Sequence, residues 1–282
     1  MRKPCLILGQ RLEVYNPDLV RGRFRHALFD FDGTLSLIRA GWQEVMVAQC
    51  ADELARTPTT EDRDRLETVC REFITRLTGK QTIYQMIRLA EEVERRGGQA
   101  RPPLEYKREY LARLHDRIGY RLDALRSGRD PAERYLVGGS VDLLEGLTQR
   151  GVTCYLASGT DEEYVQDEAR LLGLASYFDG GIYGARDDYL SFSKKMLMER
   201  IVADHGLRGE ELLAFGDGYV EIENAKQVGG AAIGVASCEL GTGSWDPWKR
   251  HRLLEVGADL LTPDWREAEN LLAWLFAEEG PP

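Results

Sequence analysis

The sequence predicts an α/β protein in which a parallel β-sheet is covered by helices on both faces and is interrupted by an all-helical insertion. Three observations support this fold class. Short apolar segments alternate with helical segments from residue 138 onward, which is the pattern of a parallel sheet. One further apolar segment, residues 26–29, has the length of a buried strand. Between these regions, residues 37–137 show only the apolar spacing of helices.

Residues 1–24 precede the first core strand. Within them, apolar segments at 5–8 and 12–15 predict a β-hairpin about Gly9 and Gln10. Inside the insertion, short breaks rich in Gly, Pro and Thr separate the helical segments. The helices that we expect there are 37–56, 61–77, 82–96, 103–126 and a short one after Pro131.

Strands and helices alternate again after the insertion. We expect a helix over 140–151 and a second one opened by Thr160, with Glu163 at the spacing of a capping box. Ser191 would cap a third helix. The strands predicted here are 152–157, 178–183, 212–215, 231–235 and 258–261.

Three polar residues come directly after predicted strands: Asp30, Ser158 and Asp217. The carboxyl ends of parallel strands meet at one edge of a sheet, and ligands bind at that edge. We therefore expect these three side chains to lie close together in a functional site.

Size and composition are those of an ordinary globular protein. A chain of 282 residues can hold one large domain or two smaller ones, and we expect a core of residues 1–36 and 138–282 with a second, helical domain over 37–137. The net charge of −10 disfavours non-specific binding to nucleic acid, and no apolar run is long enough to span a membrane. The apolar run near the N-terminus ends at Leu8, too short for a secretion signal. Scattered cysteines without a C-x-x-C pair fit a reduced, cytoplasmic location.

The segment that follows the first core strand carries the most chemical information. Residues 29–35 read Phe-Asp-Phe-Asp-Gly-Thr-Leu, so Asp30 and Asp32 start on one face of the strand. Two close carboxylates repel each other, and a cation or a shared proton relieves that cost. Gly33 lets the backbone turn and expose N–H groups that suit an anion. A magnesium ion, a carboxylate nucleophile and a phosphate would use every part of this arrangement.

This segment resembles the first motif of the haloacid dehalogenase-like (HAD) superfamily, an apolar strand followed by D-x-D-G-T-L. Residues 154–160, 193–195 and 215–221 resemble the three later motifs, in the same order: a strand ending in Ser or Thr, a lysine, and Gly-Asp with a second acid. The chain departs from the pattern at Glu221, where many members carry Asp. The resemblance implies a Rossmann-like core with a mobile helical cap over 37–137, as in the phosphoglycolate-phosphatase-like branch.

The resemblance also implies a role for each motif residue. Asp30 would attack phosphorus to form an aspartyl-phosphate, and Asp32 would act as general acid and base. Asp217 would bind Mg²⁺ together with Asp30 and the backbone carbonyl of Asp32. Glu221 would orient a metal-bound water or serve as an acid at a helix N-terminus. The residues expected to bind phosphate are Gly33, Thr34, Ser158, Gly159 and Lys194.

Two neighbouring lysines, Lys194 and Lys195, match the third motif. The motif lysine would neutralise charge between the phosphate and Asp30. We favour Lys194, because the family places this lysine in the first helical turn.

The four motifs handle only the phosphoryl group, so substrate choice would fall to the cap. The cap holds a slight excess of basic residues, which favours an anionic substrate. We therefore predict a magnesium-dependent phosphatase for a small phosphorylated metabolite. A phosphomutase and a non-catalytic binding or regulatory protein are the alternatives, whereas a dehalogenase would need no metal. The candidates for the inner surface of the cap are Arg39, Trp42, Lys80 and Gln81.

Overall fold

The computed structural model describes residues 3–240 and 242–278. In this part of the chain one sheet has the strand order β1-β2-β8-β7-β6-β3-β4-β5. The strands from β8 to β5 in that order are parallel, which confirms the predicted fold class, while β2 is antiparallel to both β1 and β8. The strands are β1 (Leu6–Leu8), β2 (Leu12–Val14), β3 (His26–Phe29), β4 (Thr153–Asp161), β5 (Ile182–Ala185), β6 (Leu212–Gly216), β7 (Ala231–Val235) and β8 (Leu260–Thr262).

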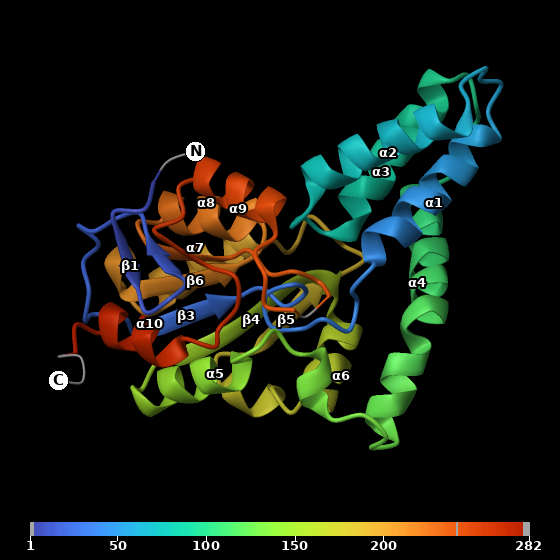
Figure 1. Ribbon diagram of the computed structural model, residues 1–282. Coiled ribbons are helices and arrows are strands. Elements are labelled where there is room, and N and C mark those ends of the chain that lie inside the picture. Colours follow the sequence, from blue (N-terminus) through green and yellow to red (C-terminus); the bar gives the residue numbers. More distant parts are fainter. Residues whose placement is uncertain (1–2, 241, 279–282) are drawn as a thin grey trace.

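Helices cover both faces of the sheet (Figure 1). Side chains alternate between the faces along β3: Phe29 belongs to the apolar cluster under α5, α6 and α10, and Leu28 belongs to the cluster under α7, α8 and α9. Because both faces are buried, the three residues that follow His26 in the strand are all apolar. The helices are α5 (Ser140–Gln149), α6 (Glu162–Leu171), α7 (Lys194–Asp204), α8 (Tyr219–Gln227), α9 (Pro247–Glu255) and α10 (Ala268–Leu275), with short 3₁₀ turns at 175–177 and 209–211.

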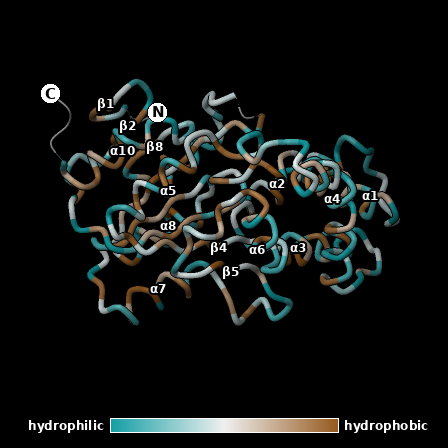
Figure 2. Tube along the Cα trace, turned by 90° about the horizontal axis from the view of Figure 1, so that it is seen from below, coloured by the Kyte–Doolittle hydropathy of each residue, from teal (hydrophilic) through white to brown (hydrophobic). Residues whose placement is uncertain are grey.

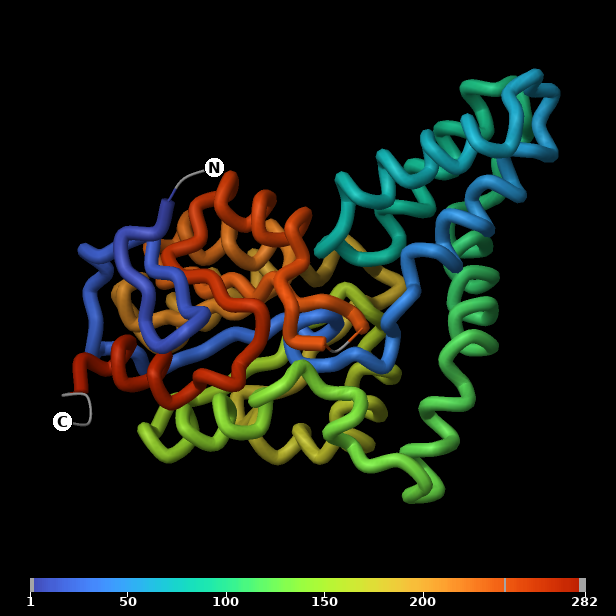
Figure 3. The backbone as a smooth tube through the Cα atoms, in the orientation of Figure 1, coloured from blue at the N-terminus to red at the C-terminus, as the bar shows by residue number. Residues whose placement is uncertain are grey.

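The N-terminal hairpin predicted from the sequence is present. Leu8 pairs with Leu12 across the turn, and Val14 pairs with Leu260 of β8. The hairpin therefore adds two strands to the sheet, at the end of the core far from the insertion (Figure 3).

Helices make up most of the insertion, which projects from the core (Figures 1 and 3). Hydrophobic and hydrophilic stretches alternate along these helices, as expected for amphipathic helices (Figure 2). The first one begins later than predicted, because Leu37 and Ile38 are buried in the core cluster and Gly41 adopts a left-handed φ of 90° just before the helix. The elements are α1 (Trp42–Ala55), α2 (Arg63–Leu77), α3 (Thr82–Arg95), α4 (Pro103–Arg126) and a 3₁₀ turn, η1 (Ala132–Tyr135).

The segments that enter and leave the insertion lie side by side. The N–H of Leu37 donates to the carbonyl of Tyr135 at 2.8 Å, and the N–H of Val137 donates to the carbonyl of Leu35 at 2.9 Å. The chain therefore leaves and re-enters the core through one short antiparallel ribbon.

Two predictions about helix starts are wrong. Strand β4 continues to Asp161, so Thr160 lies in a strand and does not open α6 with a capping box. Ser193, and not Ser191, caps α7, since its hydroxyl accepts a hydrogen bond from the N–H of Met196 at 3.1 Å. Strands β5 and β8 also begin later than predicted. Within the described ranges, no helix is both long enough and apolar enough to cross a bilayer.

Candidate active site

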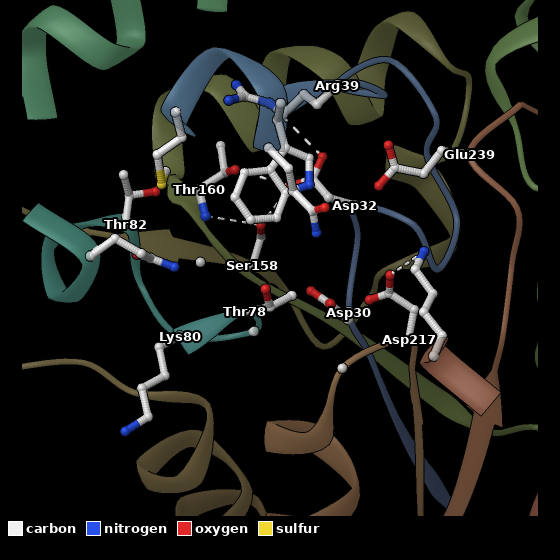
Figure 4. A pocket seen from close by; sticks show the side chains of 18 of the residues that line it. Asp30, Asp32, Arg39, Thr78, Lys80, Thr82, Ser158, Thr160, Asp217 and Glu239 are labelled. Atoms are coloured by element: carbon white, nitrogen blue, oxygen red, sulfur yellow. Dashed lines mark hydrogen bonds and ion pairs between the residues drawn. The ribbon is translucent and has the colours of Figure 1, made fainter. Parts of the chain in front are cut away.

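Residues from three neighbouring strands meet at the carboxyl edge of the sheet (Figure 4). Asp30 follows β3, and Asp217 follows the adjacent parallel strand β6. Ser158 comes from β4, on the other side of β3. The convergence predicted from the sequence follows directly from this strand order.

Asp30 is buried at the centre of the site, with 5% of its surface exposed. Its carboxylate accepts a hydrogen bond from Nζ of Lys194 at 2.6 Å. Burial raises the pKa of Asp30 well above its usual range; the Lys194 ammonium opposes this rise, and the Glu221 and Asp217 carboxylates add to it. A further cation beside Asp30 would therefore be favourable.

Lys194 lies in the site, whereas Lys195 does not. The ammonium of Lys194 is buried between the carboxylates of Asp30 and Glu221 and contacts both. Burial by itself lowers the pKa of Lys194, but these two carboxylates outweigh it and raise the pKa. The Lys195 side chain is half exposed and pairs with Glu199 at 3.8 Å.

Glu221 is fully buried in the first turn of α8. One of its carboxylate oxygens contacts Lys194, and the other has no hydrogen-bond partner among the residues that the structure describes. Its observed partner is therefore the motif lysine, and its role toward a metal-bound water stays a prediction.

Asp32 is held by hydroxyl groups of β4. Its Oδ2 accepts hydrogen bonds from Oγ1 of Thr160 at 3.0 Å and from Oγ of Ser158 at 3.3 Å. Burial raises the pKa of Asp32, while the Arg39 guanidinium and the Thr160 hydroxyl partly oppose the rise. A raised pKa makes a carboxyl group easier to protonate, which favours a role as a general acid.

Thr160 is a site residue that sequence reasoning missed. The capping-box spacing predicts that Thr160 opens a helix, whereas its distance of two residues from Ser158 is that of two side chains on one strand face. The spacing of Ser158 and Thr160 could have indicated this shared face. The predicted strand ends at residue 157, before both of them, whereas β4 continues to Asp161.

Arg39 lines the cleft above Asp30, but it lies before α1 and not on the first cap helix, where the sequence predicts it. It precedes α1, is buried, and donates two hydrogen bonds from Nε and one from Nη2 to the Glu168 carboxylate of core helix α6. Its Nε also lies 3.9 Å from Asp32 Oδ1. Arg39 therefore links α6 to the site from within the core.

Of the other three cap candidates, two line the same cleft as Arg39 and one contacts the core surface. Trp42 at the start of α1 and Lys80 in the α2–α3 loop line the cleft above Asp30. Gln81 instead donates hydrogen bonds to the carbonyls of Tyr189 and Phe192, which attaches this loop to the core.

The α2–α3 loop lies close above the second motif. A Cβ atom on Gly159 would stand 2.7 Å from the Lys80 carbonyl oxygen, so only glycine fits there. Gly159 therefore lies directly beneath the loop that carries Lys80.

Gly33 and Thr34 support the site from below. A Cβ atom on Gly33 would stand 2.2 Å from Oδ2 of Asp217, and the Thr34 hydroxyl accepts a hydrogen bond from the Asp217 N–H at 3.0 Å. The N–H groups of Gly33 and Thr34 donate to the carbonyls of Ser36 and Phe31. These two residues thus position Asp217, and their N–H groups are already engaged.

Lys249 is a second lysine in the site that the sequence did not indicate. Its ammonium, from α9, lies 2.7 Å from Oδ2 of Asp217 and 3.3 Å from the Ser237 hydroxyl. The Ser237 hydroxyl in turn donates to the carbonyl of Gly33. No local motif marks Lys249, since only the packing of α9 against the sheet edge brings it there.

The donor atoms fit a magnesium ion. Asp30 and Asp217 offer carboxylate oxygens from adjacent strand ends, whereas the Asp32 carboxylate accepts hydrogen bonds from the hydroxyl groups of β4. Among the described residues, no three Asp, Glu, His or Cys side chains are arranged so that together they could hold a metal ion. Mg²⁺ takes few protein ligands of this hard oxygen type and keeps several waters.

The cleft above these residues is shared by core and insertion. Trp42, Gln85 and Tyr110 line it from the insertion, and Trp248 and Arg252 of α9 line it from the core. It therefore has room for polar and aromatic contacts beyond the phosphoryl group.

Comparison with known proteins identifies the family of this chain. The sequence profile of the haloacid dehalogenase-like hydrolases matches residues 24–229. A 5'-nucleotidase of Pseudomonas aeruginosa is 30% identical over 153 residues, which cover 54% of this chain and 65% of that protein, slightly less than two thirds of its length.

Solved structures share the fold. A predicted phosphoglycolate phosphatase from Haemophilus somnus matches with a TM-score of 0.58 at 15% identity, over 88% of this chain and 98% of that one. CbbY from Rhodobacter sphaeroides, solved with xylulose 1,5-bisphosphate, gives 0.57 at 19% identity, over 86% and 96%. A β-phosphoglucomutase from Clostridium difficile gives 0.59 at 12% identity, over 90% and 98%.

The fold and the site define a hydrolase with an α/β core and a helical insertion after β3. The chain belongs to the haloacid dehalogenase-like hydrolases, because their profile covers most of its length. The resemblance found in the four motifs is thereby confirmed.

Proposed function

We propose that this protein is a magnesium-dependent phosphatase that hydrolyses a small phosphorylated metabolite through an aspartyl-phosphate on Asp30. The observation that carries the proposal is the contact of Asp30 with the buried Lys194 ammonium, beside an Asp32 held by two hydroxyl groups. A nucleophilic carboxylate, a charge-neutralising lysine and a proton donor are thus in one place.

The residues of the chain supply both halves of the reaction. A carboxylate oxygen of Asp30 bonds to phosphorus while the bond from phosphorus to the leaving alcohol oxygen breaks, and Asp32 donates its proton to that oxygen. Asp32 then takes a proton from water, and the water oxygen bonds to phosphorus. The bond between phosphorus and Asp30 breaks, which releases inorganic phosphate and restores the carboxylate.

The remaining motif residues would hold the phosphoryl group and its counter-ions. Asp30, Asp217 and the backbone carbonyl of Asp32 would hold a magnesium ion, which when bound neutralises charge on the phosphoryl oxygens. Lys194 would place a second positive charge beside Asp30. Ser158 and Gly159 would contact the phosphoryl oxygens.

Residues 37–137 would act as the cap that selects the substrate. The name of the Pseudomonas relative makes nucleoside monophosphates the first class to test. The aromatic side chains of Trp42, Tyr110 and Trp248 line the cleft and are suited to contact a nucleobase. Lys80 in the same cleft would pair with an anionic group.

A panel of nucleoside monophosphates, sugar phosphates and phosphoglycolate, assayed with magnesium for released phosphate, tests this function. We expect hydrolysis by the wild type and none by Asp30→Asn, whose amide cannot attack phosphorus. Asp116→Asn, on an exposed stretch of α4, is the matched control and should keep full activity. Isomerised substrate without released phosphate would instead identify a phosphomutase.

A further inference from the structure

Asp217 already has a cationic partner within the protein. The Lys249 ammonium lies 2.7 Å from its Oδ2, and only 5% of the Lys249 side chain is exposed. The Ser237 hydroxyl holds the same ammonium at 3.3 Å. This is a built, buried contact and not a transient surface pair.

The same carboxylate is the proposed magnesium ligand, and two cations on one carboxylate repel each other. The repulsion is strong because both would be largely removed from water. Asp217 cannot turn freely to serve them separately: its N–H is fixed by the Thr34 hydroxyl, and its Oδ2 lies against the backbone of Gly33. Full access of a divalent cation to Asp217 therefore requires Lys249 to move.

The side chain of Lys249 has an alternative acidic neighbour. Glu239 lines the cleft on the same side of the site and also accepts a hydrogen bond from the N–H of Gly41 at 3.0 Å. A lysine has a flexible four-carbon stem, so a short movement would transfer its charge from Asp217 toward Glu239. Figure 4 shows Glu239 and Asp217 on one side of the cleft, with Asp30 and Asp32 facing them.

We propose that Lys249 is a resident counter-ion of Asp217 that competes with the divalent cation and so sets the metal affinity of the site. The proposal rests on the magnesium site of the proposed function. Lys249 is then a positioning residue that acts through Asp217. Without the Lys249 ammonium, Asp217 is free for the metal, but the metal-free protein has lost an ion pair.

The test is a titration with Mn²⁺, in which free Mn²⁺ is counted by electron paramagnetic resonance, so that no activity is needed. Lys249→Met should bind Mn²⁺ about tenfold or more tightly than the wild type, because one unit of competing charge is removed. Lys249→Arg keeps the charge and should bind like the wild type. Lys249→Gln gives the same readout as Lys249→Met if the methionine variant does not fold.

The matched control is another Lys–Asp pair of the same length. Lys226 lies 2.8 Å from Asp259. Asp259 precedes β8 and so lies at the amino ends of the parallel strands, opposite to the edge that carries the site. Lys226→Met should leave Mn²⁺ affinity unchanged. Thermal unfolding adds a second readout. Without metal, the melting temperature of Lys249→Met should be lower than that of the wild type, and added Mg²⁺ should raise it by more than it raises the wild-type value.

The outcomes separate this inference from the proposed function. Wild-type Mn²⁺ affinity in both Lys249→Met and Lys249→Gln would overturn the inference and leave the metal site intact. Binding that is absent from wild type and variants alike would overturn the metal site as well. Tighter binding that disappears on adding Asp217→Asn would support the inference, because it places the competition at that carboxylate.

Discussion

Arg39 and Glu168 are joined by hydrogen bonds of 2.7 to 3.2 Å that connect the segment entering the insertion to core helix α6. Both side chains are buried, and Arg39 also approaches Asp32 to 3.9 Å. This pair fixes the position at which the chain leaves the core, and it supports the proposed acid–base residue from behind.

Arg39→Ala should lower the free energy of unfolding by about 3 kcal/mol, since it leaves the Glu168 carboxylate buried without its partner. It should also lower kcat to a similar extent for the metabolite substrate and for p-nitrophenyl phosphate, because Arg39 approaches Asp32, which both reactions would need, and pairs with core helix α6. Urea unfolding and steady-state kinetics measure the two effects.

Two further variants check the reason. Arg126 of α4 pairs at 2.7 Å with Asp167, which lies next to Glu168 on α6. Both side chains are nearly half exposed, so Arg126→Ala should lower the free energy of unfolding by less than about 1 kcal/mol. Adding Glu168→Gln to Arg39→Ala should restore part of the lost stability. A double variant no more stable than the single one would mean that the unpaired carboxylate is not the cause.

Lys194→Met should abolish phosphatase activity and destabilise the fold, because it leaves Asp30 and Glu221 facing each other without their shared ammonium. Lys195→Met is the matched control, one residue away on the same helix, and should change unfolding free energy by less than about 0.5 kcal/mol. Equal effects of the two substitutions on kcat would remove Lys194 from the site chemistry.

Removal of divalent cations should stop turnover, and Mg²⁺ should restore it. Calcium should inhibit, because it accepts more ligands in a looser geometry and so misaligns the approach of Asp30 to phosphorus. Phosphate release is measured after EDTA treatment and again with each ion added back. Undiminished turnover in EDTA would argue for a metal-free reaction.

His26 should make stability depend on pH. Its ring is buried beside that of His205, with ring centres 4.4 Å apart, and it hydrogen bonds to the hydroxyl of Tyr155 at 3.2 Å. Burial lowers the pKa of His26 below 6.5, and His205 and Arg25 lower it further against Asp179 and Glu211. Above pH 6.5 the folded and unfolded chains both carry a neutral ring, so His26 has no effect there.

As the pH falls below 6.5, the unfolded chain takes up a proton that the folded chain resists, and stability is lost. Urea unfolding at pH 7.5 and pH 5.5 measures this loss, which should be smaller in His26→Gln than in the wild type. The same pH dependence in both proteins would show that other groups cause it.

Much of the fold could be predicted because local patterns decide it. The apolar runs, the helical spacing of residues 82–95 and 103–126, and the order of the four motifs are all local signals. The convergence of Asp30, Ser158 and Asp217 followed from one rule about parallel strands.

What the sequence could not supply depends on packing between distant segments. The sequence around Arg39 does not reveal its partner, because Glu168 lies on a helix far along the chain. Local spacing alone therefore predicts Arg39 on the first cap helix. Lys249 was missed for the same reason, since only the seating of α9 brings it to Asp217. Thr160 could have been predicted from local sequence. Extending the predicted strand to residue 161 places Thr160 on the same strand face as Ser158.

The position of β3 in the sheet has a consequence for how the chain folds as it is synthesised. This strand lies between β4 and β6, and both are made only after the whole insertion. The helices α1 to α4 mostly contact one another and can collapse early, because helical hairpins need only local contacts. Strand β3, which is largely apolar, must therefore stay unpaired until β4 leaves the ribosome. Substitutions that destabilise the insertion should therefore cause nascent chains to aggregate before they reduce the activity of the folded protein.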